Sequence, residues 1–171
     1  MTSAYELHAV VAAPEVLAPI VERYPHARPS LVDGAELALL PMCAELYAAI
    51  DLVGFPLAPD TGFERLSPGV AAVLTACSRH GPVAYLEADY LGDLGRQSAA
   101  VWLDCQVVYG PRLLARDEPF PIAVDGLGGS PVVEALRYLG VQAVGRHDEF
   151  VVLGLGRHRS TDDWCAAWSA A

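Results

Sequence analysis

The sequence predicts an α+β domain in which a mostly antiparallel sheet with a central meander is covered by about five helices. Strand patterns and helix patterns both recur along the 171 residues, a length that suits one domain spanning residues 1–171. Three strand-like segments in the second half follow one another through very short connections, which is typical of an antiparallel meander. A hydrophobic fraction of 53% is sufficient for a sizeable core.

The first third of the chain alternates between strand and helix patterns. Residues 5–13 are rich in valine and predict a strand, and residues 14–24 place apolar side chains on one helical face. Residues 35–40 predict a short second strand. Residues 41–51 begin with proline, which is favourable at the start of a helix, and predict a second helix.

The next helix has the clearest boundary signals. Ser67 is a favourable N-cap, and Pro68 occupies the first helical position. Apolar side chains from Val70 to Cys77 follow a helical spacing, and the Gly-Pro pair at 81–82 ends the helix.

The meander is predicted from residues 83–91, 98–103 and 106–110, each of which has a strand pattern. The glycine-bounded turn at 92–95 and the two-residue turn at 104–105 join them. The first turn lacks the Lys and Ser/Thr of a phosphate-binding loop, so a hairpin is the simpler interpretation.

The last third predicts a helix, a strand and a second helix. Ser130 has the position of an N-cap, and Gly140 would end that helix. Residues 149–156, with the sequence EFVVLGLG, predict a final strand. Ser160 and Asp163 have capping-box spacing and predict a C-terminal helix.

The net charge of −10 limits the classes of partner. Nucleic acids and anionic membrane surfaces require a basic patch, so we expect neither as a partner. An acidic chain is compatible with a basic protein partner, because opposite charges steer association. Only 19% of the residues are charged, which indicates an apolar surface hidden in the core or in an interface, including one of a homo-oligomer.

The four cysteines are too far apart in the sequence to form a zinc or redox motif, and they are Cys43, Cys77, Cys105 and Cys165. We therefore expect no metal and no cofactor. The first residues lack the basic start of a signal peptide, and no apolar run has the length of a membrane span. These features predict a cytoplasmic location with reduced thiols.

The main candidate site lies on the strand at 83–91. Because side chains alternate between the two faces of a strand, Tyr85, Glu87 and Asp89 share one face, and the residues between them should form the core face. The two carboxylates would lie about 7 Å apart. Such a pair suits a hard cation, acid/base chemistry or the arginines of a partner. A polar strand edge facing solvent is the simpler alternative.

Basic and polar residues elsewhere are candidates to meet these carboxylates. Arg96 and Gln97 follow the hairpin turn directly. Arg157, His158 and Arg159 form a local basic cluster that suits a carboxylate or phosphate ligand, and His158 has the intrinsic pKa of a general base. A solvated turn is the alternative interpretation of this cluster.

Two segments carry a resemblance to a family. AYLEADYLGDLGRQSAAVW at 84–102 and GLGRHRSTDDW at 154–164 resemble segments of small, mostly actinobacterial proteins with the patterns E-A-[ED]-Y-[FL]-G-x-x-G-x-Q and G-L-G-R-H-R-x-T-[DE]-D-W. The resemblance implies no particular chemistry, and it associates the chain with toxin-immunity gene neighbourhoods. Asp93 departs from the usual second glycine, so a role that needs bare backbone there is not implied.

Three functional hypotheses follow, and the third is a structural subunit or homodimer that associates through an apolar face. The first is a small acidic cytoplasmic protein that binds another protein, such as an immunity-type inhibitor of a toxin. The second is an enzyme that uses Glu87 or Asp89 as acid or base, with Arg157 and His158 binding an anionic substrate. No serine elbow, metalloprotease helix, kinase signature or EF-hand supports a specific reaction.

Overall fold

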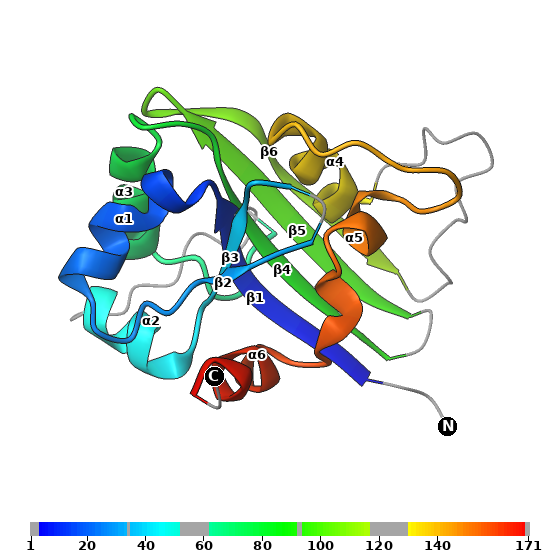
Figure 1. The fold of residues 1–171 in the computed structure, drawn as a ribbon, viewed down its shortest axis with the longest axis horizontal. Helices are drawn as coiled ribbons and strands as arrows, with labels where there is room; N and C mark the ends of the chain where they lie inside the picture. Colours follow the sequence, from blue (N-terminus) through cyan, green and yellow to red (C-terminus); the bar gives the residue numbers. More distant parts are fainter. Residues whose placement is uncertain (1–3, 34, 52–61, 92–93, 117–129, 170–171) are drawn as a thin grey trace.

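The computed structural model describes residues 4–33, 35–51, 62–91, 94–116 and 130–169. In these ranges the chain forms one six-stranded sheet with helices on both of its faces (Figure 1). The predicted α+β class is confirmed.

All pairings in the described sheet are antiparallel. The strands are β1 (Ala4–Ala12), β2 (Ser30–Leu31), β3 (Ala38–Pro41), β4 (Val83–Leu91), β5 (Leu94–Leu103) and β6 (Gln106–Arg116). Their order is β2-β3-β1-β4-β5-β6, and each neighbouring pair is antiparallel. The predicted meander, β4 to β6, makes up one half of the sheet.

Helices lie on both sides of this sheet. They are α1 (Pro14–Arg23), α2 (Ala44–Ile50), α3 (Pro68–Cys77), α4 (Pro131–Tyr138), α5 (Glu149–Val152) and α6 (Thr161–Ser169), with a 3-10 helix at Leu155–Arg157. Helices α1, α2 and α3 pack on one face, whereas α4, α5 and α6 contribute to the core on the other (Figure 1).

The middle strands are therefore buried on both faces. Leu86 packs in the core beneath α4, and Tyr85 packs in the core beneath α1 to α3. This corrects the expectation that only the Leu86 face of the strand at 83–91 belongs to the core. A strand covered on both faces has a nearly continuous apolar sequence, as VAYL at the start of β4 does.

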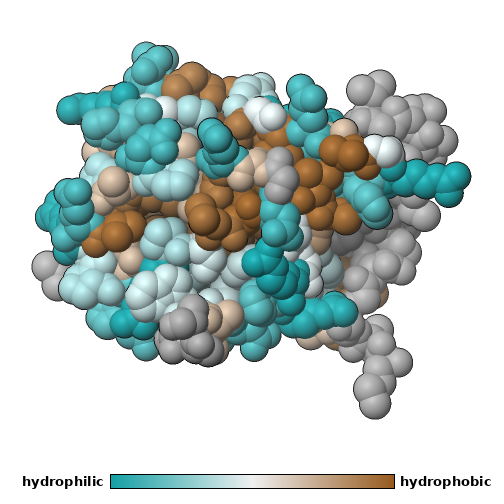
Figure 2. Space-filling model, in the orientation of Figure 1, coloured by the Kyte–Doolittle hydropathy of each residue, from teal (hydrophilic) through white to brown (hydrophobic). Residues whose placement is uncertain are grey.

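The core does not take up all of the apolar side chains. Figure 2 shows apolar surface across the middle of one face, with hydrophilic side chains around it. Leu31, Val144 and Val151 are among the large apolar side chains that are exposed. Part of the apolar excess seen in the sequence therefore lies at the surface.

The prediction of a final strand at 149–156 is wrong, because these residues form α5 and a 3-10 helix. Asp148 caps α5, with its carboxylate accepting from the Val151 amide at 3.0 Å. Gly154 has a φ of 66°, a left-handed conformation that ends the helix. Glu149 is buried and pairs with Arg137 of α4 at 2.7 Å. These contacts outweigh the strand preference of Val151 and its neighbour.

Other local predictions are confirmed. The hydroxyl groups of Ser67, Ser130 and Ser160 accept hydrogen bonds from amides three residues ahead, as N-caps do. Asp104 and Cys105 both have positive φ, which is the conformation of a two-residue hairpin turn.

The β4–β5 hairpin is also as predicted, since Leu91 pairs directly with Leu94. Gly95 has a φ of 148°, and a Cβ atom there would collide with the carbonyl oxygen of Asp89. Glycine is therefore required at this position. The turn residues 92–93 lie outside the described ranges.

A segment near the C-terminus completes the edge of β1. Strand β3 pairs only with the second half of β1, from Ala9 onward. Alongside the first half, the Glu6 amide donates to the carbonyl of Arg159 at 2.9 Å, and the His8 amide donates to Thr161 Oγ1 at 2.8 Å. We call residues 159–161 the C-terminal strap.

Candidate functional site

Six polar side chains lie in two rows across β1, β4 and β5. Residues that are paired on antiparallel strands point to the same face of the sheet, so the register defines each row. The inner row is His8, Glu87 and Ser98, and the outer row is Glu6, Asp89 and Arg96. Both rows lie on the face that α1 to α3 cover further along the sheet.

Glu87 is the centre of the inner row and is almost completely buried, at 6% exposure. Its Oε2 accepts from the Glu64 amide at 2.7 Å, and its Oε1 accepts from the amides of Arg65 and Leu66 at 2.8 and 3.1 Å. The Tyr85 hydroxyl donates to Oε1 at 2.9 Å. Four donors thus converge on this side chain, which holds the 62–66 segment on the sheet.

The other polar residues of β5 hold the same segment. The Ser98 hydroxyl donates to the carbonyl of Gly62, which also accepts from the Arg96 guanidinium at 3.3 Å. Arg96 forms an ion pair with Glu64 at 2.5 Å. The 62–66 segment therefore closes the inner row from solvent.

Two tyrosines, the buried Tyr85 and the partly buried Tyr47, extend this network. The hydroxyl groups of Tyr47 and Tyr85 lie 2.5 Å apart, and the ring edge of Phe63 packs against Tyr85. Burial raises the pKa of both tyrosines above their usual value. The phenols therefore stay protonated at neutral pH, and Tyr85 keeps its proton to donate to Glu87.

A carboxylate–histidine pair joins the two rows on β1. His8 Nδ1 lies 2.6 Å from Glu6 Oε1, and the amide and hydroxyl of Thr161 donate to Glu6 at 3.2 and 3.1 Å. The hydrogen bond from His8 is the main cause of a lowered pKa for Glu6. The His8 side chain is nearly buried, and it lines a small polar pocket with Glu87, Asp89 and Arg96.

Glu6 and His8 were not singled out from the sequence. The available signal is that two polar residues two apart interrupt an otherwise apolar strand, as Glu87 and Asp89 do on β4. Pairing these two strands face to face is what creates the cluster, and the register of that pairing is not visible locally.

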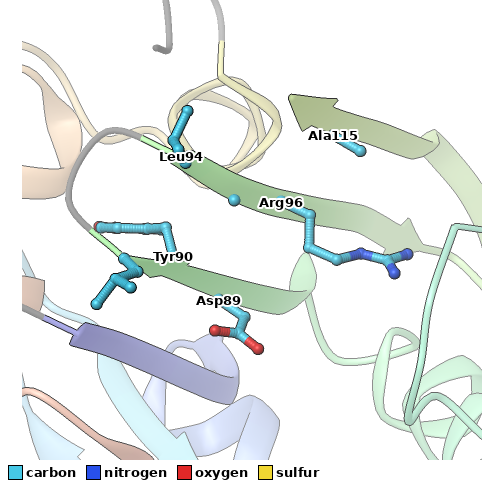
Figure 3. A pocket seen from close by; sticks show the side chains of 7 residues that line it. Asp89, Tyr90, Leu94, Arg96 and Ala115 are labelled. Carbon is cyan, nitrogen blue, oxygen red and sulfur yellow. The ribbon is translucent and has the colours of Figure 1, made fainter. Parts of the chain in front are cut away.

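The outer row borders an open hollow at the end of the β4–β5 hairpin. We call it the hairpin-end groove; its volume is about 520 Å³, and it is lined by Asp89, Tyr90, Leu91, Leu94, Gly95, Arg96 and Ala115 (Figure 3). The Asp89 side chain is exposed, and it forms no hydrogen bond or ion pair with the described residues. Leu91 and Leu94 are 55% and 46% exposed.

The basic cluster at 157–159 does not lie over Glu87. Arg157 pairs with Asp33 at 2.8 Å and lies over the ring of Trp164, whose edge also contacts His158. Trp164 belongs to the core on the face opposite the inner row. Arg159 contributes its carbonyl to the C-terminal strap. Arg157 and His158 therefore share no site with the β4 carboxylates, whereas the charge of Arg159 acts on Tyr90, the neighbour of Asp89 on β4.

The remaining predicted residues are divided between environments. Tyr85 is buried in the core, and Arg96 lies in the outer row beside Asp89. Gln97 is next to Arg96 in β5, so its side chain points to the opposite face. Of the predicted set, only Asp89 and Arg96 line the hairpin-end groove.

Comparisons with known proteins give no match to a family model, a curated protein or a solved structure. Within the described ranges, no three His, Cys, Asp or Glu side chains are grouped to hold a metal ion. None of the described helices has the length and apolar character needed to cross a bilayer.

Proposed function

We propose that this chain is a small protein-binding protein that receives a segment of its partner in the hairpin-end groove. The observation that carries the proposal is the groove itself, where exposed leucines lie beside the free carboxylate of Asp89. An immunity-type inhibitor of a toxin is the specific form that we favour, because such a protein acts by occupying the surface of its partner.

The charges around the groove define the partner's chemistry. Asp89 and Arg96 are the charged residues among those that line the groove. Arg96 already pairs with Glu64. A partner segment with an arginine or lysine next to an apolar side chain would therefore satisfy both Asp89 and the leucines. The net charge of −10 would steer a basic partner toward this chain and disfavour nucleic acid.

We infer a cytoplasmic location for this interaction. None of the described cysteines is in a disulfide, and reduced thiols suit a reducing compartment.

The test is co-purification of the full chain from its native host, followed by binding measurements with the recovered partner. We expect Asp89→Arg to weaken binding at least tenfold, because it places like charges together. Glu22→Arg is the matched control, since it makes the same charge change at an exposed position of α1. Increasing salt should weaken binding to the original chain.

A chain that is recovered alone and monomeric, or a partner that binds Asp89→Arg and the original chain equally, would contradict the proposal. Light scattering distinguishes a further outcome. A dimer that Leu94→Asp dissociates would assign the groove to a second copy of the chain, which also contradicts a separate partner.

An enzyme is the second candidate, and the Glu6–His8 pair is the observation that favours it. A histidine held by a carboxylate at 2.6 Å is suited to general acid/base work, and Asp89 lies beside it across the strands. Glu87 is less suited, because its carboxylate already accepts four hydrogen bonds. The test is turnover of a panel of hydrolase substrates: activity lost in His8→Gln supports an enzyme, and absence of any turnover argues against one.

A further inference from the structure

A second hollow, of about 280 Å³, lies where the start of α2 meets α6. It is lined by His26, Arg28, Pro41, Cys43, Glu45, Cys165 and Ala166. Cys43 directly precedes α2, and Cys165 lies on α6. Neither cysteine is in a disulfide, and both are only partly buried, so reagents can reach them.

The two thiols face the same hollow, although the two residues are far apart in the sequence. The Cys43 thiol is close enough to contribute to the raised pKa of Cys165. Both side chains line the same hollow of about 280 Å³, so the start of α2 and α6 hold the two sulfur atoms near each other. The other two cysteines have different surroundings: Cys77 is buried in the core, and Cys105 accepts from Arg79 at 3.1 Å.

We propose that Cys43 and Cys165 form a reversible disulfide when the protein meets a hydroperoxide. This redox site is independent of the hairpin-end groove, which lies at the β4–β5 hairpin and shares no residue with it.

The reaction balances in two steps. The Cys43 thiolate attacks the terminal oxygen of the hydroperoxide, which breaks the O–O bond and yields a sulfenic acid and, after protonation of the leaving group, an alcohol or water. The Cys165 sulfur then attacks the oxidised sulfur of Cys43 and displaces water. Overall, two thiols and one hydroperoxide give one disulfide and one water. The peroxide's other product is an alcohol, or a second water when the oxidant is hydrogen peroxide.

The surroundings assign the two roles. Burial, followed by the influence of Cys43 and of the nearby carboxyl groups of Asp162 and Glu45, raises the pKa of Cys165 to about 12. Cys165 therefore remains a thiol at neutral pH and is the resolving partner, whereas Cys43 makes the first attack. The imidazole of His26 and the positive charge of Arg28 line the same hollow.

The first test uses the unaltered full chain. Native protein is exposed to stoichiometric hydrogen peroxide, the remaining thiols are alkylated, and the peptides are mapped by mass spectrometry. We expect the Cys43–Cys165 peptide to dominate the linked products and to disappear after dithiothreitol. In urea its share should fall to that of random pairing. Independent modification of the two cysteines without a linked peptide, or an equal share in urea, would overturn the proposal.

Variants then test the assigned roles in a Cys105→Ser background, which removes the partly buried thiol beside Arg79. With Cys165→Ser, we expect a sulfenic acid on Cys43 that dimedone traps. With Cys43→Ser, we expect neither a linked peptide nor a dimedone adduct on Cys165. A dimedone adduct on Cys165 in the second variant would reverse the roles and contradict the order proposed here.

Discussion

Glu87 and Asp89 are the same kind of side chain, two residues apart on one face of one strand, yet they lie in opposite environments. Glu87 is covered by the 62–66 segment and accepts four hydrogen bonds, whereas Asp89 faces the hairpin-end groove. What covers the strand, and not the spacing of the carboxylates, decides the role of each one. The inner row is a determinant of the fold, and the outer row is the accessible surface.

Removing the Glu87 carboxylate should have the largest effect on stability. In Glu87→Ala, three backbone amides of the 62–66 segment lose their acceptor in a buried place, so we expect a loss of about 3 kcal/mol or more in the free energy of unfolding. Urea denaturation measures it. A loss below about 1 kcal/mol would mean that the segment is held by other contacts.

Ser98→Ala should have a smaller effect on the same segment. The variant removes one hydrogen bond to the carbonyl of Gly62, which keeps the guanidinium of Arg96 as a donor. We expect a loss of about 1 kcal/mol in the same denaturation experiment. A loss as large as that of Glu87→Ala would place the main anchor at Ser98 instead.

Glu6 connects the two rows, and its effect should depend on pH. Its pKa is lowered in the folded chain, chiefly by the hydrogen bond from His8, so its stabilisation is present above the unfolded value of 4.5 and is lost as the pH falls through the folded value. Glu6→Gln cannot ionise. We therefore expect the stability difference between the two proteins to shrink on acidification below about pH 5. A difference that stays constant with pH would contradict this assignment.

Asp89→Asn should have the smallest effect on folding. The side chain is exposed and has no partner in the described part of the chain, so we expect a change within about 0.5 kcal/mol. Destabilisation comparable to Glu87→Ala would remove the distinction between the rows. Loss of partner binding with unchanged stability would strengthen it.

Much of the fold is predictable from local chemistry. Ser67 and Ser130 are N-caps, and the turn at 104–105 has the predicted geometry, because each depends on residues a few positions apart. The helix at Glu149–Val152 was missed because its valines favour strands. The capping Asp148 and the left-handed Gly154 were the signals against a strand.

The candidate site is less predictable, because long-range pairing creates it. The strand at 83–91 identifies Asp89 and Glu87, but three of the four donors to Glu87 are main-chain amides, which almost any residues at 64–66 supply. The proximity of Cys43 and Cys165 likewise depends on how α6 packs near the start of α2. The spacing of the cysteines in the sequence does not predict it.

The C-terminal strap determines when, during synthesis, the first half of the β1 edge becomes hydrogen-bonded. Strand β1 is made early, yet the amides of Glu6 and His8 find their acceptors only when Arg159 and Thr161 arrive. Until then a nascent chain presents an unpaired strand edge, the kind of surface that invites pairing with other chains. The first half of β1 is therefore protected on this edge only after residues 159–161 have been made.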